Sequence, residues 1–491
     1  MIRFSQYTKS VTISLIGFLL FFNMTALNNI AVAQELKETI TAFSDSSLHP
    51  LSLTLPNAIE MAKHNYPEIK AAIAHEQAAQ FGIRKAKTAY LPKGNLLIQE
   101  VRGTSNNITG PLLPQLTIPT IAGAVNGAGN DLSGAWVSGL GSIISWEPFD
   151  FGLRKSQVNL AKAITKETGA QRIVTELQVQ SAAAEAFLNL VAAQQVLKAK
   201  YAQLDRLKIF TDTVKILVSK ELKPGVDQYL AEAELARAQD EVTDAEQAKQ
   251  IATVSLARLI GIASDSIIID TNPLIESPPE IDIPTVDPFQ NPLILSQKAA
   301  VDVAHAKLTI INKTYRPQFS LIGVLWGRGS GFRTDISVDE SKGYLPTKFN
   351  YAVGLSVSFP ILDIFPLRAD KKIAIQNEAE QCARYELALL NIRTQDLQVH
   401  AMLQGALKVA ANAPVRLKAA TEAAKCARIR YEHALTTVND IAQDEQLLTQ
   451  AQVDYALAQL RVWRALLAGA VTMGDIRPFV NHLKNASLQR R

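Results

Sequence analysis

Two stretches of about seventy residues each lack almost every helix breaker, and this feature constrains the fold more than any other. Residues 153–222 contain no proline and a single glycine, Gly169. Residues 367–435 contain only Gly405 and Pro414 as breakers, and we expect Pro414 to kink or split that helix. At about 1.5 Å per residue, seventy helical residues span roughly 105 Å, which excludes an ordinary compact core. Such lengths favour coiled-coil packing, in which alanine lets helices approach closely.

Each long helix is followed by a reversal of the chain and a second helical stretch. The turns are expected at residues 223–225 and 436–438. The sequence therefore predicts two antiparallel helical hairpins, over residues 153–262 and 367–474.

The order of elements occurs twice along the chain. Prolines, tyrosines and acidic residues at element boundaries match at an offset of 225 or 213 residues: Pro67 with Pro292, Tyr90 with Tyr315, Pro92 with Pro317, Asp150 with Asp363, Asp227 with Asp440, and Glu232 with Glu445. Matches at boundaries make coincidence among alanine-rich helices a weak alternative. We therefore predict two repeats, residues 51–262 and 292–474, joined by a proline-rich, acidic and extended linker at residues 263–291.

The clearest strand lies near the end of the second repeat. Large apolar residues alternate there with small or polar ones, the large ones being Tyr351, Val353, Leu355, Val357 and Phe359. This period of two predicts a strand of a membrane β-barrel with its large side chains facing lipid. The alternative is a half-buried strand of a soluble sandwich, since one strand alone does not distinguish the two.

Four strands are expected in all, at about residues 94–102, 136–147, 318–326 and 350–359. Trp136, Trp146 and Trp326 lie near predicted strand ends, where an aromatic girdle would be. Because about eight strands are the practical minimum for a membrane barrel, four strands must be shared between subunits.

The N-terminus has the pattern of an export signal. Arg3 and Lys9 precede an uncharged apolar stretch of about a dozen residues, and a small-residue cleavage pattern ends at Ala33. We predict a signal peptide over residues 1–33 and a linker over residues 34–50. An N-terminal membrane anchor is the alternative, disfavoured because a spanning helix needs about 20 apolar residues. Residues 475–491 are expected to form a basic, solvated tail.

The sequence carries no recognisable catalytic or metal-binding pattern. The seven histidines show no paired metal-ligand spacing, and no nucleophile elbow or phosphate-binding loop occurs. We therefore expect no enzymatic activity, cofactor or metal, and a secreted hydrolase lacks support. A net charge of +4 without basic runs argues against nucleic-acid binding. Cys382 and Cys426 are expected far apart on one long helix, and therefore free.

Several motifs occur in a defined order, and two kinds of junction among them occur twice. They are residues 53–58 followed by 65–69, the Tyr-x-Pro junctions at residues 90–92 and 315–317, and the strand-to-helix junctions at residues 146–152 and 359–363. In order and in duplication they resemble the TolC family of outer-membrane efflux proteins, over nearly the whole chain from Leu53 to Gly474.

This resemblance implies a membrane β-barrel continued by an all-α coiled-coil tunnel. The chain would form a homotrimer with a shared twelve-stranded barrel in the cell outer membrane, in contact with its lipid, and with helices in the periplasm. It would be a passive conduit of a tripartite efflux or type I secretion system. The implied partners are a periplasmic adaptor and an inner-membrane pump or ABC exporter. The alternative is a soluble periplasmic coiled-coil adaptor or scaffold protein.

The resemblance also implies two groups of site residues. Acidic residues after the second turn would form a periplasmic pore gate, carried here by Asp440, Gln443 and Asp444, with Gln443 where the family often has a second Asp. For Asp440 a role in starting the helix remains open, because a negative charge is favourable there. The hairpin tips would face an adaptor through Lys223, Gly225, Asp227, Thr437 and Val438.

Two departures from the family pattern stand out. Ala434 stands where the family usually has glycine before the second turn, so the resemblance does not define the contacts of that tip with an adaptor. Residues 364–366 replace the glycines after Asp363 and predict an altered helix start with Pro366 in the first turn.

Overall fold

The computed structural model describes residues 51–107, 129–262, 267–275, 287–334, 337–339, 341–433 and 435–488. The signal peptide and linker predicted for residues 1–50 lie outside this part of the chain. The chain divides into two compact units, each described by itself below. The first contains the described residues up to Met61, Ala186–Pro273 and Ala420–Val453, and the second contains the remainder. Both predicted repeats contribute to each unit, so the units do not follow the repeats.

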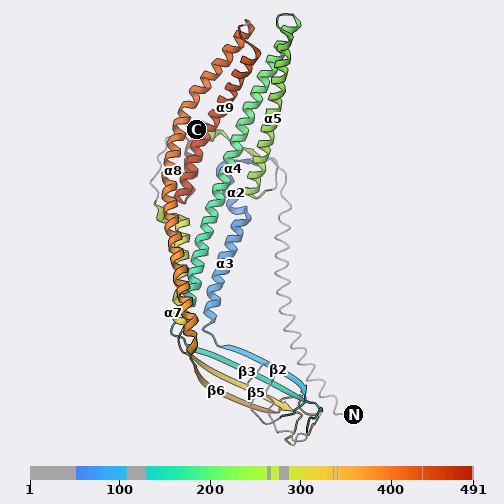
Figure 1. Ribbon diagram of the computed structural model, residues 1–491, viewed down its shortest axis with the longest axis vertical. Coiled ribbons are helices and arrows are strands. Elements are labelled where there is room, and N and C mark those ends of the chain that lie inside the picture. Colours follow the sequence, from blue (N-terminus) through green and yellow to red (C-terminus); the bar gives the residue numbers. More distant parts are fainter. Residues whose placement is uncertain are drawn as a thin grey trace. The chain divides into compact units, whose positions relative to one another are not determined.

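The two helical hairpins consist of four long helices (Figure 1). The first pairs α4 (Leu153–Ser219) with α5 (Gly225–Ile260). The second pairs α8 (Ile364–Glu432) with α9 (Val438–Met473). Pro414 lies inside α8, which continues through it, so the helix is not split there. Among the described helices, none combines the length and apolar character that a bilayer crossing requires.

Shorter helices precede the strands in both repeats. They are α2 (Leu55–Asn65) and α3 (Pro67–Thr88) in the first repeat, and α7 (Pro292–Thr314) in the second. The matched prolines Pro67 and Pro292 are the first residues of α3 and α7. Proline is favoured at this position because its fixed φ suits a helix and its missing N–H has no partner to lose.

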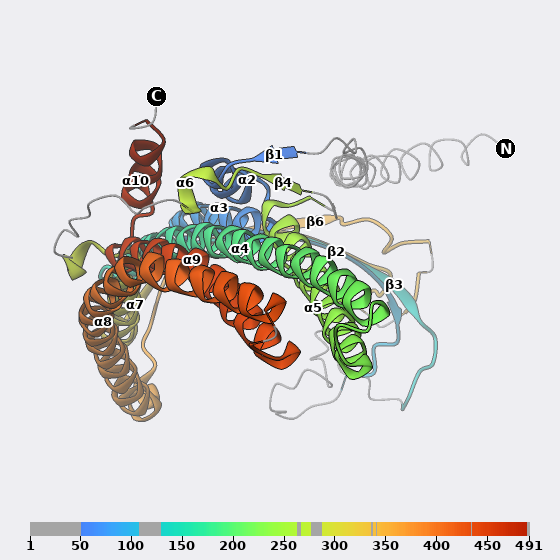
Figure 2. The ribbon, with the colours of Figure 1, turned by 90° about the horizontal axis from the view of Figure 1, so that it is seen from above.

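The described part of the predicted linker at residues 263–291 contains short regular elements. These are β4 (Ile267–Ile269), α6 (Asn272–Ile275) and the 3₁₀ turn η1 (Pro288–Gln290). In the first unit, β4 pairs in parallel with β1 (Leu51–Leu53), and Figure 2 shows the two strands side by side. The extended backbone was predicted, but its pairing with the start of the first repeat was not.

The second unit contains one four-stranded sheet (Figure 1). It consists of β2 (Lys93–Gly103), β3 (Ala135–Phe149), β5 (Gln318–Ser330) and β6 (Lys348–Ser358). The order is β2-β3-β5-β6, every pair is antiparallel, and the β3–β5 pair joins the two repeats. Within the described residues, β2 and β6 each pair along one edge only. The four predicted strands and the two long hairpins are confirmed, whereas the separate β1–β4 pair was not predicted.

The C-terminal segment contradicts the prediction of a solvated tail. It forms α10 (Arg477–Leu488), seen in Figure 2, after Gly474 has ended α9 with a positive φ of 81°. Phe479 and Leu483 are buried, and the Phe479 ring lies 6.3 Å from that of Trp463. Phe479 and Leu483 are four residues apart, a spacing that places both on one face of a helix.

Candidate membrane face and hairpin tips

The strand register places large apolar side chains of all four strands on one face of the sheet. Leu325 lies opposite Tyr351, and Leu321 lies opposite Leu355. Since cross-strand partners share a face, we define the apolar face by these two pairs together with Leu96, Ile98, Leu140, Ile144, Trp146, Val353 and Val357. All of these side chains are exposed in the single chain, Tyr351 to 81% and Val353 to 74%.

The predicted lipid-facing residues Tyr351, Val353, Leu355 and Val357 thus share one exposed face. Phe359 follows the last residue of β6 and is also exposed. A contiguous exposed apolar surface of this kind marks a site that another apolar phase covers. Strands of 11 to 15 residues are long enough to cross a bilayer when tilted.

We name the opposite face the small face. It carries many small or polar residues, among them Gly139, Gly141, Ser145, Asn350, Ala352, Gly354 and Ser356, interspersed with the larger apolar Leu97, Ile143, Ile322 and Val324. Trp326 pairs with Gly141 and Asn350, so it lies on this face. Trp326 was predicted to lie near a strand end, but β5 continues beyond it to Ser330.

The two strand-to-helix junctions differ as predicted. In the first, the Asp150 carboxylate accepts hydrogen bonds from the amides of Gly152 (3.0 Å) and Arg154 (2.6 Å), which caps α4. Phe151 and Gly152 both have positive φ there. In the second, α8 begins directly at Ile364 after the 3₁₀ turn η2 (Ile361–Asp363), with Pro366 in its first turn.

The first hairpin tip contacts a buried tyrosine of the second hairpin, all within the first unit. The Tyr431 hydroxyl donates to Asp227 Oδ2 at 3.1 Å, and Lys223 Nζ lies 4.2 Å from the centre of the ring. The pKa of the Tyr431 hydroxyl is raised mainly by burial and, to a smaller extent, by its hydrogen bond to Asp227. Lys223 and Asp227 were predicted to face an adaptor; in the structure, Lys223 lies over the ring of Tyr431 and Asp227 accepts from its hydroxyl.

Tyr431 is part of a small core in which all four long helices meet. The cluster contains Phe210, Val214, Ala231, Ala427, Tyr431, Val438 and Ile441. Val438, predicted to face an adaptor, is only 1% exposed, so its side chain serves this core. Gly225 and Thr437, the other predicted tip residues, are both exposed.

Asp440 is the third residue of α9 and forms a reciprocal cap with the residue before the helix. Its Oδ2 accepts from the Thr437 amide (2.9 Å), the Thr437 hydroxyl (2.8 Å) and the Thr436 hydroxyl (2.7 Å), while the Asp440 amide donates to Thr437 Oγ1 (3.3 Å). The hydrogen bond from the Thr436 hydroxyl and, to a smaller extent, that from the Thr437 amide lower the pKa of Asp440 to about 2. Gln443 is exposed and Asp444 is half-buried.

A buried carboxylate that the sequence did not single out lies one turn further along α9. Glu445, 3% exposed, accepts from Arg206 Nε and from Arg428, each at 2.6 Å. The three side chains join α4, α8 and α9 in the first unit. Glu232, its match in the first repeat, is instead partly exposed and pairs with Lys215 at 3.2 Å. The repeat therefore predicted the position of Glu445 but not its burial.

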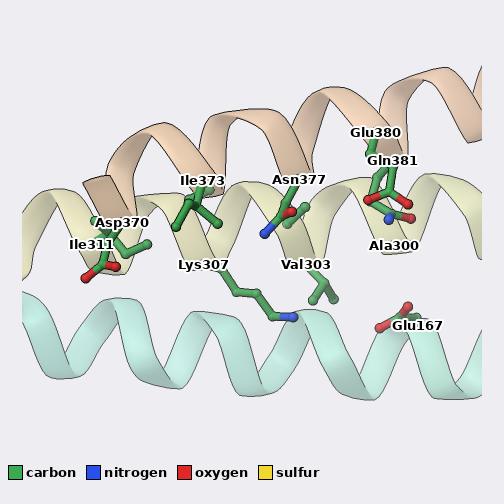
Figure 3. A pocket seen from close by; sticks show the side chains of 12 residues that line it. Glu167, Ala300, Val303, Lys307, Ile311, Asp370, Ile373, Asn377, Glu380 and Gln381 are labelled. Atoms are coloured by element: carbon green, nitrogen blue, oxygen red, sulfur yellow. The ribbon is translucent and has the colours of Figure 1, made fainter. Parts of the chain in front are cut away.

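A groove of about 470 Å³ lies between α4, α7 and α8 in the second unit (Figure 3). Its lining includes the charged side chains of Glu167, Lys307, Asp370 and Glu380 among alanines and isoleucines. In Figure 3 the Lys307 side chain extends from α7 toward α4. The residues that line the groove include no serine, cysteine, threonine or histidine.

The fold and sequence agree with those of known proteins. Residues 58–262 and 289–468 match the sequence family described as outer membrane efflux protein. No curated protein sequence matches the chain.

Solved structures of outer membrane channels share the fold. The Campylobacter jejuni CmeC outer membrane channel is 18% identical, with 89% of this chain and 90% of CmeC covered and a TM-score of 0.68. The Neisseria gonorrhoeae MtrE outer membrane channel in its open state is 18% identical, covering 88% and 93%, with a TM-score of 0.64. The Vibrio cholerae outer membrane protein VceC is 18% identical, covering 86% and 96%, with a TM-score of 0.66. The family match spans most of the chain, which therefore belongs to the outer membrane efflux protein family.

Proposed function

We propose that three copies of this outer-membrane efflux channel protein close into one passive conduit, with a twelve-stranded barrel. The observation that carries the proposal is the apolar face, which runs across all four strands and is exposed in the single chain. A soluble periplasmic adaptor or scaffold, the alternative reading, does not account for it. In the outer membrane this face would contact lipid, and the small face would line a water-filled lumen.

The edges of the sheet support assembly between copies. β2 and β6 each contain 11 residues and are the two outer strands. Each backbone N–H or C=O left without a hydrogen bond in a bilayer costs several kcal/mol of free energy, so a sheet with open edges is not stable there. Pairing β6 of one copy with β2 of the next removes these edges. Three copies reach the strand number that a closed barrel requires.

The hairpin tips are proposed to meet a periplasmic adaptor, which couples the channel to an inner-membrane pump or ABC exporter. Drugs, small molecules or proteins would be the cargo. Gly225 and Thr437 are exposed and offer accessible positions for this contact. The side chains of Lys223 and Asp227 are partly occupied by their contacts with Tyr431.

Asp440 and Asp444 are proposed to form the acidic entrance of the conduit, with Gln443 beside them. The cap at Asp440 is compatible with this second role. All the hydrogen bonds that Asp440 accepts from described residues reach Oδ2, so Oδ1 remains available to a cation. Three copies would bring three such oxygens to one ring.

The barrel assignment is tested by charge substitutions on the two faces of β6. Val353→Arg on the apolar face should destabilise the assembled protein by about 2–4 kcal/mol and deplete it from the outer-membrane fraction. Ser356→Arg, on the small face of the same strand, is the matched control and should be tolerated. Equal effects on both faces would contradict the assignment, as would a monomeric mass of the detergent-solubilised protein in native mass spectrometry.

A further inference from the structure

The charged residues on the small face are all cations. The strand register places Lys93, Arg328 and Lys348 there, and no acidic residue of the registered strand pairs shares this face. Arg328 lies directly opposite Lys348, in one row with Gly139 and Gln99 of the other two strands. Like charges directly opposite on neighbouring strands are destabilising, which makes this pair unusual in a sheet.

Neither cation of this pair is neutralised by the described residues. Arg328 and Lys348 are both exposed, and neither forms an ion pair in the described part of the chain. In the loop that joins their strands, Asp339 already binds Arg333 at 3.0 Å and lies 3.4 Å from Lys342. A methyl group added at the neighbouring Gly139 would approach only Gln99 Cβ, at 3.9 Å, so the row is open beside Arg328. The row therefore presents two cations that no described residue pairs, at the end of the sheet that carries the loops.

We propose that Arg328 and Lys348 form an anion-binding ring inside the loop end of the conduit, which favours anionic solutes there. This inference rests on the proposed trimer, in which the small face lines the lumen and three copies bring six cations to one level. Rings of Arg and Lys select anions in pores, and the guanidinium fork matches the oxygens of carboxylates and phosphates. A row of cations with low-dielectric walls also raises the local concentration of anions.

The test is block of single-channel current by inorganic tripolyphosphate. Wild-type protein in a planar bilayer at about 0.1 M salt, where the Debye length is about 10 Å, should be blocked when the anion is added to the compartment that faces the loops. Block should weaken in about 1 M salt because the charges are screened. The double variant Arg328→Gln/Lys348→Gln should need at least about tenfold more anion for half-block, a change of about 1.4 kcal/mol.

Two further variants make the result specific. Arg102→Gln removes one cation per chain near the same end of the sheet, but on the other face, since Arg102 pairs with Trp136. It should leave the block unchanged. Exchanging the two cations by Arg328→Lys/Lys348→Arg keeps both charges and should retain the block even if the Gln variant assembles poorly.

The outcomes separate this inference from the proposed function. Wild-type channels that conduct but are not blocked, or a block unchanged in the double Gln variant, would overturn the anion ring and leave the conduit intact. A wild-type protein that forms no discrete conductance steps would overturn the conduit and the ring together.

Discussion

Replacing Glu445 by glutamine should loosen the second hairpin from α4. The substitution preserves the shape of the side chain but removes the negative charge between Arg206 and Arg428. One amide oxygen then replaces two carboxylate oxygens, so one of the two guanidinium groups loses its acceptor. The two cations also repel each other without the anion that separates them.

The magnitude follows from the burial of the three side chains. At an effective dielectric constant of about 20 and a separation of about 4 Å, each arginine attracts the carboxylate by roughly 4 kcal/mol before desolvation is subtracted. Removing one partner of a fully buried pair typically costs about 3–5 kcal/mol. Here Glu445 is buried, but the side chains of Arg206 and Arg428 remain 20% and 39% exposed. Water therefore relieves part of the penalty, and we expect a loss of about 2–3 kcal/mol.

Hydrogen exchange measured by mass spectrometry on the detergent-solubilised protein reports this change locally. A loss of about 2–3 kcal/mol in local stability corresponds to roughly 30- to 150-fold faster exchange of the amides at the start of α9. The matched control is Glu232→Gln, which removes a partly exposed carboxylate from the equivalent position of the first hairpin. An exposed pair contributes only about 0–1 kcal/mol, so exchange in α5 should change little.

Either of two exchange results would contradict this expectation. An increase below about threefold at the start of α9 in Glu445→Gln would mean that the buried network contributes no net stability. Equal acceleration in both variants would show that burial of the carboxylate does not decide its energetic role.

Three other predictions use the same purified protein. Gly474→Ala should lower stability by about 2–5 kcal/mol in thermal melting, because φ is 81° and the new methyl group would lie 2.3 Å from a proline ring, while Gly405→Ala, with open space around it in α8, should be neutral or stabilising. The pKa of Asp440 is lowered from 3.8 to about 2, so its cap stabilises the protein fully above pH 3.8 and is lost as the pH falls toward 2. The difference in melting temperature between wild type and Asp440→Asn should therefore shrink from pH 3.8 to pH 2. A difference that does not depend on pH would argue against the cap. Cys382 and Cys426 are exposed and free, so both should react with maleimide without reductant, and a link between them in the intact mass would contradict a continuous α8.

The elements that a local pattern encodes were predictable from the sequence. The absence of breakers predicted α4 and α8, and strict alternation predicted β6 together with its exposed apolar face. The matched prolines and the Asp150 junction marked where helices begin, because proline acts through its own backbone and the Asp150 carboxylate bonds amides only two and four residues away. The resemblance to TolC proteins is confirmed by the family match.

Features that depend on distant partners were not predictable in this way. The Arg206–Glu445 bond joins residues 239 positions apart, and nothing near Glu445 distinguishes it from the partly exposed Glu232. Tyr431 was missed as a site residue because its role depends on Asp227 of the other hairpin. Helix α10 was missed because the segment is short and its two buried apolar residues, Phe479 and Leu483, gain their role only from packing on distant residues such as Trp463.

The pairing of β3 with β5 has a consequence for how the chain reaches its native state. Val137 pairs with Ser330, and the chain between these two residues contains the whole first helical hairpin. Closing so long a segment carries a larger entropy loss than forming the β2–β3 or β5–β6 pair. Contacts between residues distant in sequence form slowly, whereas helices form within microseconds. The helical hairpins should therefore fold first. A chain in which the β2–β3 and β5–β6 pairs have not yet joined exposes two additional strand edges, which promote aggregation.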